Sequence, residues 1–212
     1  MTDTLVCGRP GAGQARRHYP AQLSAAWELE DQRRVTIRPV LPADAALTRA
    51  FVRQLSPESR YSRFLVSLSD LPPSMLVYLT DVDHVRHVGL IALTQVYAKQ
   101  VQVGEARYVI ETASPDGSTR AEFAIAVADD WQAAGVGSRL LRMLEKAARA
   151  AGVAQLTGDV LGSNRKALDF MRQRGFVTRP NRDEARLLRV EKNLLPASGK
   201  PMSDAAAESK AA

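Results

Sequence analysis

The segment from residue 121 to residue 141, AEFAIAVADDWQAAGVGSRLL, constrains the fold most strongly. Its first eight residues alternate, with Phe123, Ile125 and Val127 on one side and Glu122 on the other, which predicts a strand. From residue 136 onward, apolar residues recur about once per helical turn, which predicts a helix. Between the two lies a short loop with the pattern Gln-x-x-Gly-x-Gly. The segment therefore predicts a strand, a glycine loop and a helix in direct succession.

The glycine loop indicates a binding site for a phosphate group. Glycines at the start of a helix let a ligand approach the backbone, and the free N–H groups of the first turn favour an anion. No Gly-Lys-Ser/Thr follows, which excludes a Walker loop, and the third glycine of the dinucleotide fingerprint is missing. A glycine-containing helix start without any ligand is the alternative.

Composition limits the class of protein. At 212 residues the chain has room for one domain or at most two. No apolar run is long enough for a membrane helix and no secretion signal is present, so we expect a cytoplasmic protein without a membrane partner. The single Cys7 excludes an internal disulfide framework, and the three histidines form no zinc signature, so we expect no metal.

Charge favours anionic partners. The chain carries 29 Lys and Arg against 23 Asp and Glu, a net charge of +6. This excess fits a phosphate-bearing ligand, although it also fits simple solubility. No basic run is interleaved with aromatic residues, so we do not expect nucleic acid as a partner.

The chain divides into three parts. Residues 1–31 are expected to form a flexible arm, with a short helix around Ala21 to Leu29 that includes Trp27. Residues 32–194 carry the periodic segments of one domain. Residues 195–212 are small and polar and are expected to be a disordered tail.

The pattern within this domain predicts an α+β or α/β fold. Strands are expected near residues 33–37, 88–96, 108–112, 121–128, 156–161 and 185–192. Helices are expected to begin near residues 44, 56, 71, 136 and 164. A turn at residues 114–118 favours antiparallel pairing before the glycine loop, and the strand–helix–strand order after it implies a parallel crossover. We expect a mixed central sheet of about six to seven strands flanked by helices.

The glycine loop after an apolar strand resembles the acetyl-CoA loop of the GNAT family of N-acetyltransferases. The sequence Asn164-Arg165-Lys166-Ala167 and the later Arg174-Gly175-Phe176 extend the resemblance, which covers about residues 33–194. More narrowly, residues 55–61 (LSPESRY), Phe64 and residues 121–124 (AEFA) are similar to the acetyltransferase domain of bacterial protein lysine acetyltransferases. That domain is often fused to a cyclic-nucleotide or acyl-CoA synthetase module, and no such module fits within these 212 residues.

The resemblance implies acetyl-CoA as co-substrate and assigns residues to its binding. Backbone groups of the strand would hold the thioester carbonyl and the pantetheine arm, and backbone N–H groups of the loop would hold the pyrophosphate. Asn164 is implied to contact the same arm, and its type also suits a helix N-cap. The implied binding residues are Ile125, Ala126, Val127, Gln132, Ala133, Ala134, Gly135, Val136, Gly137, Ser138 and Asn164.

Glu122 is the candidate general base. A lysine amine has a pKa of about 10.4, so roughly one molecule in a thousand is neutral near pH 7.4, and collecting that form costs on the order of 4 kcal/mol. A carboxylate near the acceptor therefore helps. Glu122 lies within an otherwise apolar strand, and the resemblance implies that it acts directly or through water. The alternative is a structural carboxylate paired with Arg120, Arg107 or another basic residue.

One position departs from the family pattern. Many GNAT enzymes carry a tyrosine four residues before the Gly-Phe pair as general acid for the leaving thiolate, and here that position is Met171. Either the thiolate leaves unaided, or Tyr61, Tyr78 or Tyr97 donates the proton.

The predicted function is transfer of an acetyl group from acetyl-CoA to a primary amine, with a protein lysine as the favoured acceptor. A small amine as acceptor and a non-catalytic CoA-binding regulatory module are the alternatives. The sequence leaves open the acceptor's identity, the preferred acyl chain and the choice between monomer and homodimer.

Overall fold

The computed structural model describes residues 19–111 and 119–195. The described residues form one eight-stranded sheet in the order β1-β2-β3-β4-β5-β6-β8-β7. All neighbouring strands are antiparallel except β5 and β6, which run parallel. The strands are β1 (Ala25–Glu28), β2 (Arg34–Pro39), β3 (His87–Val96), β4 (Lys99–Ile110), β5 (Arg120–Val127), β6 (Gln155–Leu161), β7 (Val177–Pro180) and β8 (Leu187–Asn193).

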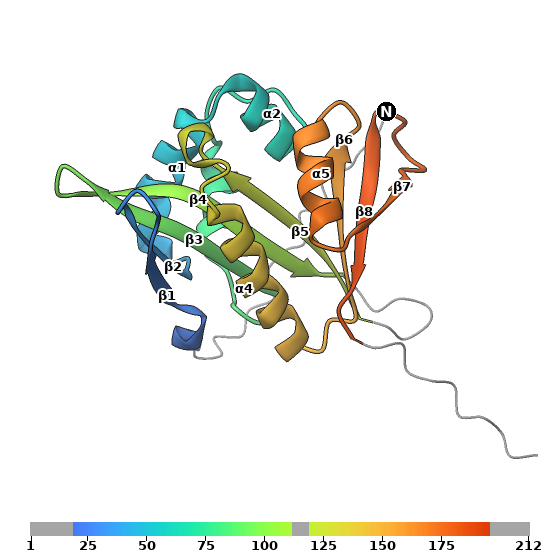
Figure 1. Ribbon diagram of the computed structural model, residues 1–212, viewed down its shortest axis with the longest axis horizontal. Coiled ribbons are helices and arrows are strands. Elements are labelled where there is room, and N and C mark those ends of the chain that lie inside the picture. Colours follow the sequence, from blue (N-terminus) through green and yellow to red (C-terminus); the bar gives the residue numbers. More distant parts are fainter. Residues whose placement is uncertain (1–18, 112–118, 196–212) are drawn as a thin grey trace, which may run out of the picture.

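Helices cover both faces of this sheet (Figure 1). On one face, α4 packs on β3, β4 and β5 through a stripe of buried leucines that includes Leu140 and Leu144. On the other face, α1 packs on β4 and α3, with Phe51, Leu55 and Leu79 in a separate cluster. The helices are α1 (Ala45–Gln54), α2 (Pro57–Phe64), α3 (Pro73–Thr80), α4 (Val136–Ala150) and α5 (Arg165–Gln173), with short 3₁₀ turns η1 (Ala21–Leu23), η2 (Pro42–Asp44) and η3 (Asp129–Trp131).

The parallel pair β5–β6 is short and opens into a fork. Only three residue pairs join the strands, and the last of them is Glu122 with Thr157. Beyond this point the ring of Phe123 fills the space between the strands, because a side chain at Gly158 would meet the ring and carbonyl oxygen of Phe123 at 3.0 Å. The aromatic ring of Phe176 packs on Phe123 with 5.1 Å between ring centroids. The residues of β5 that follow Phe123 therefore face a gap rather than a neighbouring strand.

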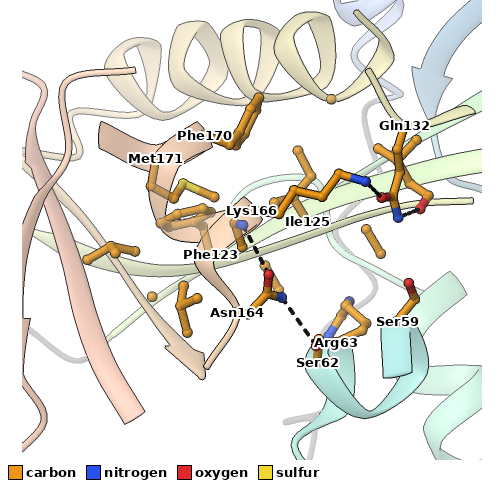
Figure 2. A pocket seen from close by; sticks show the side chains of 18 of the residues that line it. Ser59, Ser62, Arg63, Phe123, Ile125, Gln132, Asn164, Lys166, Phe170 and Met171 are labelled. Atoms are coloured by element: carbon orange, nitrogen blue, oxygen red, sulfur yellow. Dashed lines mark hydrogen bonds between the residues drawn. The ribbon is translucent and has the colours of Figure 1, made fainter. Parts of the chain in front are cut away.

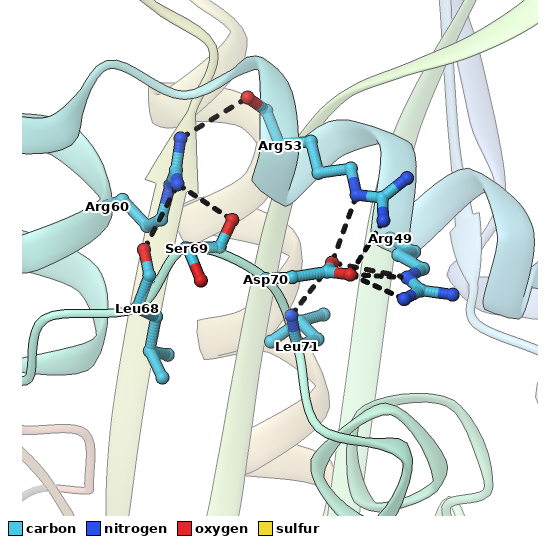
Figure 3. Close-up of polar contacts among 7 residues, drawn as sticks. All are labelled: Arg49, Arg53, Arg60, Leu68, Ser69, Asp70 and Leu71. Carbon is cyan, nitrogen blue, oxygen red and sulfur yellow. Dashed lines mark hydrogen bonds and ion pairs between the residues drawn. The ribbon is translucent and has the colours of Figure 1, made fainter.

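The helical region over the other face is tied together by arginines (Figure 3). Asp70 accepts hydrogen bonds from Arg49 and Arg53 of α1, which fixes the loop after α2 against α1. Arg60 of α2 donates to the carbonyl oxygens of four residues around it, Arg53, Leu55, Leu68 and Ser69. These contacts hold α2 over the open end of the fork.

The structure confirms the mixed fold and corrects several elements. The sheet has eight strands, more than the six to seven expected. Residues 25–28, expected within a helix of a flexible arm, form β1, because Trp27 lies in register with Val35 and packs against the core. β4 begins at Lys99 rather than near Tyr108, and β7 was not expected. The predicted turn at residues 114–118 and most of the two predicted flexible ends lie outside the described residues.

Candidate active site

A cleft of about 970 Å³ lies where the fork opens. Its walls come from α2, β5, the loop after β5, the end of β6 and α5, so elements far apart in sequence meet there (Figure 2). Of the predicted site residues, all but Ala134 and Val136 line it. Val136 is fully buried in the core, so its side chain anchors the helix. The cleft residues from the prediction are Glu122, Ile125, Ala126, Val127, Gln132, Ala133, Gly135, Gly137, Ser138 and Asn164.

The glycine loop ends in a helix start with unused donors. Gly135 has φ +83° and is followed at once by the first turn of α4, where no side chain caps the helix. Arg139 is the residue whose N–H bonds back to the Gly135 carbonyl oxygen. The N–H groups of residues 136–138 therefore have no partner within the helix and point along its start, a geometry that suits phosphate oxygens.

The backbone of β5 presents its groups in alternation. Ala128 donates its N–H to Val103, and Arg120 accepts from Glu111, so the even-numbered residues of β5 pair with β4. The odd-numbered residues, Ile125 and Val127, consequently direct N–H and C=O toward the fork. Ala126 is one of the even-numbered residues, and its backbone groups face Glu105 of β4 rather than the fork.

Glu122 is the last residue of β5 that pairs with β6, and its side chain is exposed to the cleft. Its carboxyl lies on the same face of the sheet as α2, opposite to Phe123. Partial removal from water raises the pKa of Glu122, and the charges of Asp159 and Glu111 add to this effect, while Arg189 and Arg63 oppose it. The side chain of Glu122 reaches solvent through the cleft, but the strands beside it still remove part of its hydration. Arg107, one of its expected structural partners, pairs with Glu105 instead.

Asn164 caps α5 and also reaches across the cleft. Its side-chain oxygen accepts from the N–H of Ala167 at 3.0 Å, which confirms the N-cap prediction. Its Nδ2 donates to the hydroxyl of Ser62 on α2 at 3.2 Å. This contact separates the cleft from a smaller hollow of about 500 Å³ bordered by Tyr61 and Arg186.

Lys166 was not predicted as a site residue, yet it spans the cleft (Figure 2). Its Nζ donates to Gln132 Oε1 at 2.6 Å, and Gln132 Nε2 donates to the carbonyl oxygen of Val127 at 3.2 Å. The start of α5 is thus connected to the glycine loop and to the fork edge of β5. The two residues between Asn164 and Ala167 are both basic, and no pattern in the sequence distinguishes the one that turns toward the cleft.

Asp129 connects α2 to the segment after β5. Its carboxylate accepts from the Ser56 N–H at 2.9 Å, from the Ser56 hydroxyl at 3.0 Å and from the Ser59 hydroxyl at 2.6 Å. These bonds lower the pKa of Asp129 against the opposing effect of burial. The helix on the acceptor side therefore begins at a fixed distance from the glycine loop.

A buried ionic cluster lies beneath α2. Glu105 is fully buried and accepts from Arg63 Nε at 2.7 Å and from Arg107 at 2.8 Å. Although burial opposes ionisation, the two guanidinium groups lower the pKa of Glu105 to about 2. Arg107 also lies 3.1 Å from His87 Nε2. Burial and the Arg107 charge lower the pKa of His87 to about 4, so its ring is neutral at pH 7.

Met171 stands at the position where many GNAT enzymes carry a tyrosine. Met171 is buried against the core and lines the cleft. Tyr61 accepts a hydrogen bond from Arg186 at the smaller hollow, Tyr78 is largely exposed on α3, and Tyr97 is almost fully exposed in the β3–β4 turn. Among the described residues, no tyrosine lines the main cleft.

Three further observations concern a cation near the glycine loop, metal ligands and membrane helices. Arg139, in the first turn of α4, stacks on Trp27 with its guanidinium carbon 4.7 Å from the ring centroid. Within residues 19–111 and 119–195, no group of three His, Cys, Asp or Glu side chains could hold a metal ion. No helix in these ranges is long and apolar enough to cross a membrane.

A sheet that forks beside a glycine loop, with unused helix N–H groups at one end and a carboxylate at the other, defines an acyl-CoA-dependent acetyltransferase site. The sequence profile of the acetyltransferase (GNAT) family matches residues 45–176. The chain belongs to this family, and it is an acetyltransferase with acetyl-CoA as co-substrate.

Two curated relatives are similar to most of the domain. Acetyltransferase PA5475 of Pseudomonas aeruginosa is 32% identical over 157 residues, which are 74% of this chain and 82% of that protein. Acetyltransferase Pat of Mycolicibacterium smegmatis is 33% identical over 141 residues, which are 66% of this chain. The match spans only 40% of Pat, so the activity of that whole protein does not transfer directly.

Solved structures show the same fold. The GNAT domain of S. lividans PAT superimposes with a TM-score of 0.74 at 28% identity, covering 83% of this chain and 99% of that domain. YncA of Salmonella typhimurium, solved with its cofactor acetyl-CoA, gives a TM-score of 0.62 at 16% identity, covering 77% of this chain and 96% of that chain.

Proposed function

We propose that this enzyme transfers the acetyl group of acetyl-CoA to the side-chain amine of a protein lysine, with Glu122 as general base. The observation that carries this proposal is the position of Glu122. It is the last paired residue before the fork, on the face covered by α2, and its carboxyl is exposed in the cleft.

Glu122 would remove a proton from the acceptor amine, directly or through one water. Its raised pKa makes it a stronger base than an ordinary carboxylate, because burial and the neighbouring charges of Asp159 and Glu111 favour the protonated form. The same negative charges attract a lysine ammonium before it loses its proton.

The fork edge of β5 would hold the acyl end of the co-substrate. When bound, acetyl-CoA supplies an activated acetyl thioester. Backbone N–H groups at Ile125 and Val127 point into the fork and suit the thioester oxygen, on which negative charge develops. Ala126 contributes its side chain to the cleft, whereas its backbone is used by β4.

The glycine loop would hold the pyrophosphate. The N–H groups of residues 136–138 are unused within α4, and the Gln132–Gly135 segment leads into them. Lys166 lies across this path and adds a cation. Asn164 would contact the pantetheine arm from the opposite wall.

A protein acceptor is favoured over a small amine by the shape of the acceptor side. An enzyme for small amines needs an enclosed acceptor pocket, whereas Glu122 here remains exposed in an open cleft. The helical region next to it also presents large exposed apolar side chains, as expected where another protein docks. These residues are Val66 in the loop after α2, Val77 and Tyr78 on α3, and Val85 in the loop before β3. Similarity to Pat of M. smegmatis and to PAT of S. lividans supports the same choice.

The test compares wild type with Glu122→Gln in an assay of free thiol released from acetyl-CoA. Acceptors are a panel of small amines and a cell lysate freed of small molecules. We expect turnover on the protein fraction, with a decrease of 100-fold or more in Glu122→Gln, on the order of a lost general base. Glu58→Gln is the matched control, since Glu58 also lines the cleft on α2, and it should retain most activity.

Two outcomes would contradict the proposal. Turnover only on a small amine would reassign the acceptor. Equal turnover by Glu122→Gln and wild type on protein would leave the acetyltransferase without its proposed base. Mass spectrometry of the labelled proteins identifies the acetylated side chain in either case.

A further inference from the structure

The guanidinium of Arg63 is bound to the protein through Nε, and Arg63 also lines the cleft. Its Nε donates to the buried carboxylate of Glu105, and its side chain is only 10% exposed. The two terminal nitrogens have no hydrogen-bond partner among the described residues, although Arg63 lines the cleft. Because these nitrogens reach solvent through the cleft and make no hydrogen bond to the described residues, a ligand that supplies oxygens can replace the water around them.

The cluster around Arg63 carries excess positive charge. Arg63 and Arg107 share a single carboxylate, that of Glu105, which is fully buried. The remaining member, His87, is neutral at pH 7. Its Nε2 lies 3.1 Å from Arg107, and burial together with the charge of Arg107 opposes protonation of the ring. Two guanidinium groups therefore share one carboxylate, and of these two arginines only Arg63 lines the cleft.

The strand register places Arg63 close to the reacting groups. Glu105, its anchor, lies opposite Ala126 of β5, and Glu122 lies four residues earlier on the same face of the same strand. Arg63 also interacts electrostatically with Glu122. The cleft therefore presents an acidic part around Glu122 and Asp159 and a basic part at Arg63, both on the α2 side. Such a pair of charges is complementary to a substrate that carries an ammonium group and a carboxylate.

We propose that Arg63 forms a carboxylate-binding subsite, so that this enzyme prefers a substrate with a carboxylate near the reacting group. The planar fork of an arginine suits the two oxygens of a carboxylate better than a single carbonyl oxygen. The carboxylate comes either from an acidic residue beside the target lysine or from the free end of a dicarboxylic acyl chain. The first source rests on the proposed lysine acetylation, and the second extends the reaction to succinyl transfer.

The first arm of the test uses acetyl-CoA and peptides with one lysine. Glu is compared with Gln at each of the three positions on either side of the lysine, and kcat/KM is measured with the full chain. We expect wild type to prefer Glu at one position by about tenfold or more, as for a charge-assisted hydrogen bond. Arg63→Met should abolish this preference.

The second arm uses a peptide without acidic residues and compares succinyl-CoA with acetyl-CoA. In succinyl transfer the lysine nitrogen forms an amide with the succinyl carbonyl, the thioester bond breaks, and CoA leaves as the thiol with the proton from the amine. If the acyl chain supplies the carboxylate, wild type uses succinyl-CoA, and Arg63→Met lowers the ratio of succinyl transfer to acetyl transfer at least tenfold.

The controls separate the role of the charge from that of the fold. Arg186→Met removes an exposed cation at the neighbouring hollow and should leave both preferences unchanged. In Arg63→Met the carboxylate of Glu105 keeps its ion pair with Arg107, and the midpoint of thermal unfolding measures whether this variant is folded. Arg63→Lys keeps the charge without the fork, and it should restore part of the preference.

Wild type without discrimination in both arms, or discrimination that persists in Arg63→Met, would overturn the proposal while lysine acetylation stands. If no lysine peptide reacts, the proposed acceptor is wrong, and the subsite is then judged by binding. In that case glutarate should raise the melting temperature of wild type more than its diamide, glutaramide, does. The difference should disappear in Arg63→Met, and equal effects of the two compounds would refute the subsite.

Discussion

Glu122 combines a proposed catalytic role with a cost in stability. Its pKa is raised in the folded protein, so ionisation of this carboxyl disfavours the folded state. The penalty is absent below the unfolded pKa near 4.5, where both states are protonated, and is complete above the folded pKa. We therefore expect Glu122→Gln to raise the midpoint of thermal unfolding at pH 7.5, with no difference from wild type at pH 4. A lower midpoint at pH 7.5 would show that the carboxylate has a structural partner.

His87 predicts how stability depends on pH. Because its pKa falls from 6.5 to about 4 on folding, only the unfolded state binds its proton between these values. The free energy of unfolding should thus decrease as the pH falls from 6.5 to 4, by roughly 2 kcal/mol after allowance for partial solvent contact. Urea denaturation of wild type and His87→Gln at pH 7 and pH 4.5 measures this loss. The variant should lack it, and an equal loss in both proteins would assign it to other groups.

The residues that could be predicted are those whose role depends on the local chain. Glu122, the two loop glycines and Asn164 stand at positions defined by their own strand or helix start, and the structure brings them to one cleft. Arg63 and Lys166 act through contacts made 42 and 34 residues away, with Glu105 and Gln132. No spacing in the sequence encodes such contacts.

At the level of elements, the β5 strand should show two kinds of backbone amide. The N–H groups of Ala124 and Ala126 are paired with β4, whereas those of Ile125 and Val127 face the fork. We expect slow hydrogen exchange for the first pair and fast exchange for the second, measured by NMR. Acetyl-CoA should slow exchange at the second pair only. Protection of all four amides without ligand would contradict the fork.

The start of α4 offers a test with a matched control. Gly135 and Gly152 lie before and after this helix, both have positive φ (+83° and +74°), and both have open space where a Cβ would stand. Replacing either glycine with alanine should destabilise the protein by about 1 kcal/mol. Only Gly135→Ala should also weaken acetyl-CoA binding, measured by calorimetry, because Gly152 lies at the far end of α4. Equal affinity in the two variants would remove the loop from the binding site.

The elements that sequence analysis missed are those with little periodicity of their own. β1 and β7 are four residues long and lie at the two edges of the sheet, where exposure removes the alternation that marks a strand. β4 was recognised only near its end, because its buried part contains Gln102, Glu105 and Arg107. Glu105 and Arg107 can be buried in β4 because they pair with each other and with Arg63 of α2, and this pairing is visible only in the structure.

For the molecule as a whole, the fork divides the sheet unequally. Strands β1 to β5 lie on one side and β6, β8 and β7 on the other, and three backbone pairs join them. Phe123 and Phe176 close the inner end of the gap, so the two parts still share one core.

In the proposed function, acetyl-CoA occupies the gap between β5 and β6. Acetyl-CoA binds only the folded chain, so at 100 times its dissociation constant it adds about 2.7 kcal/mol to the free energy of unfolding. Resistance to proteolysis should therefore follow the supply of the co-substrate, and a pulse of protease at rising acetyl-CoA concentration measures it. Cells with abundant acetyl-CoA would therefore keep this enzyme longer than starved cells.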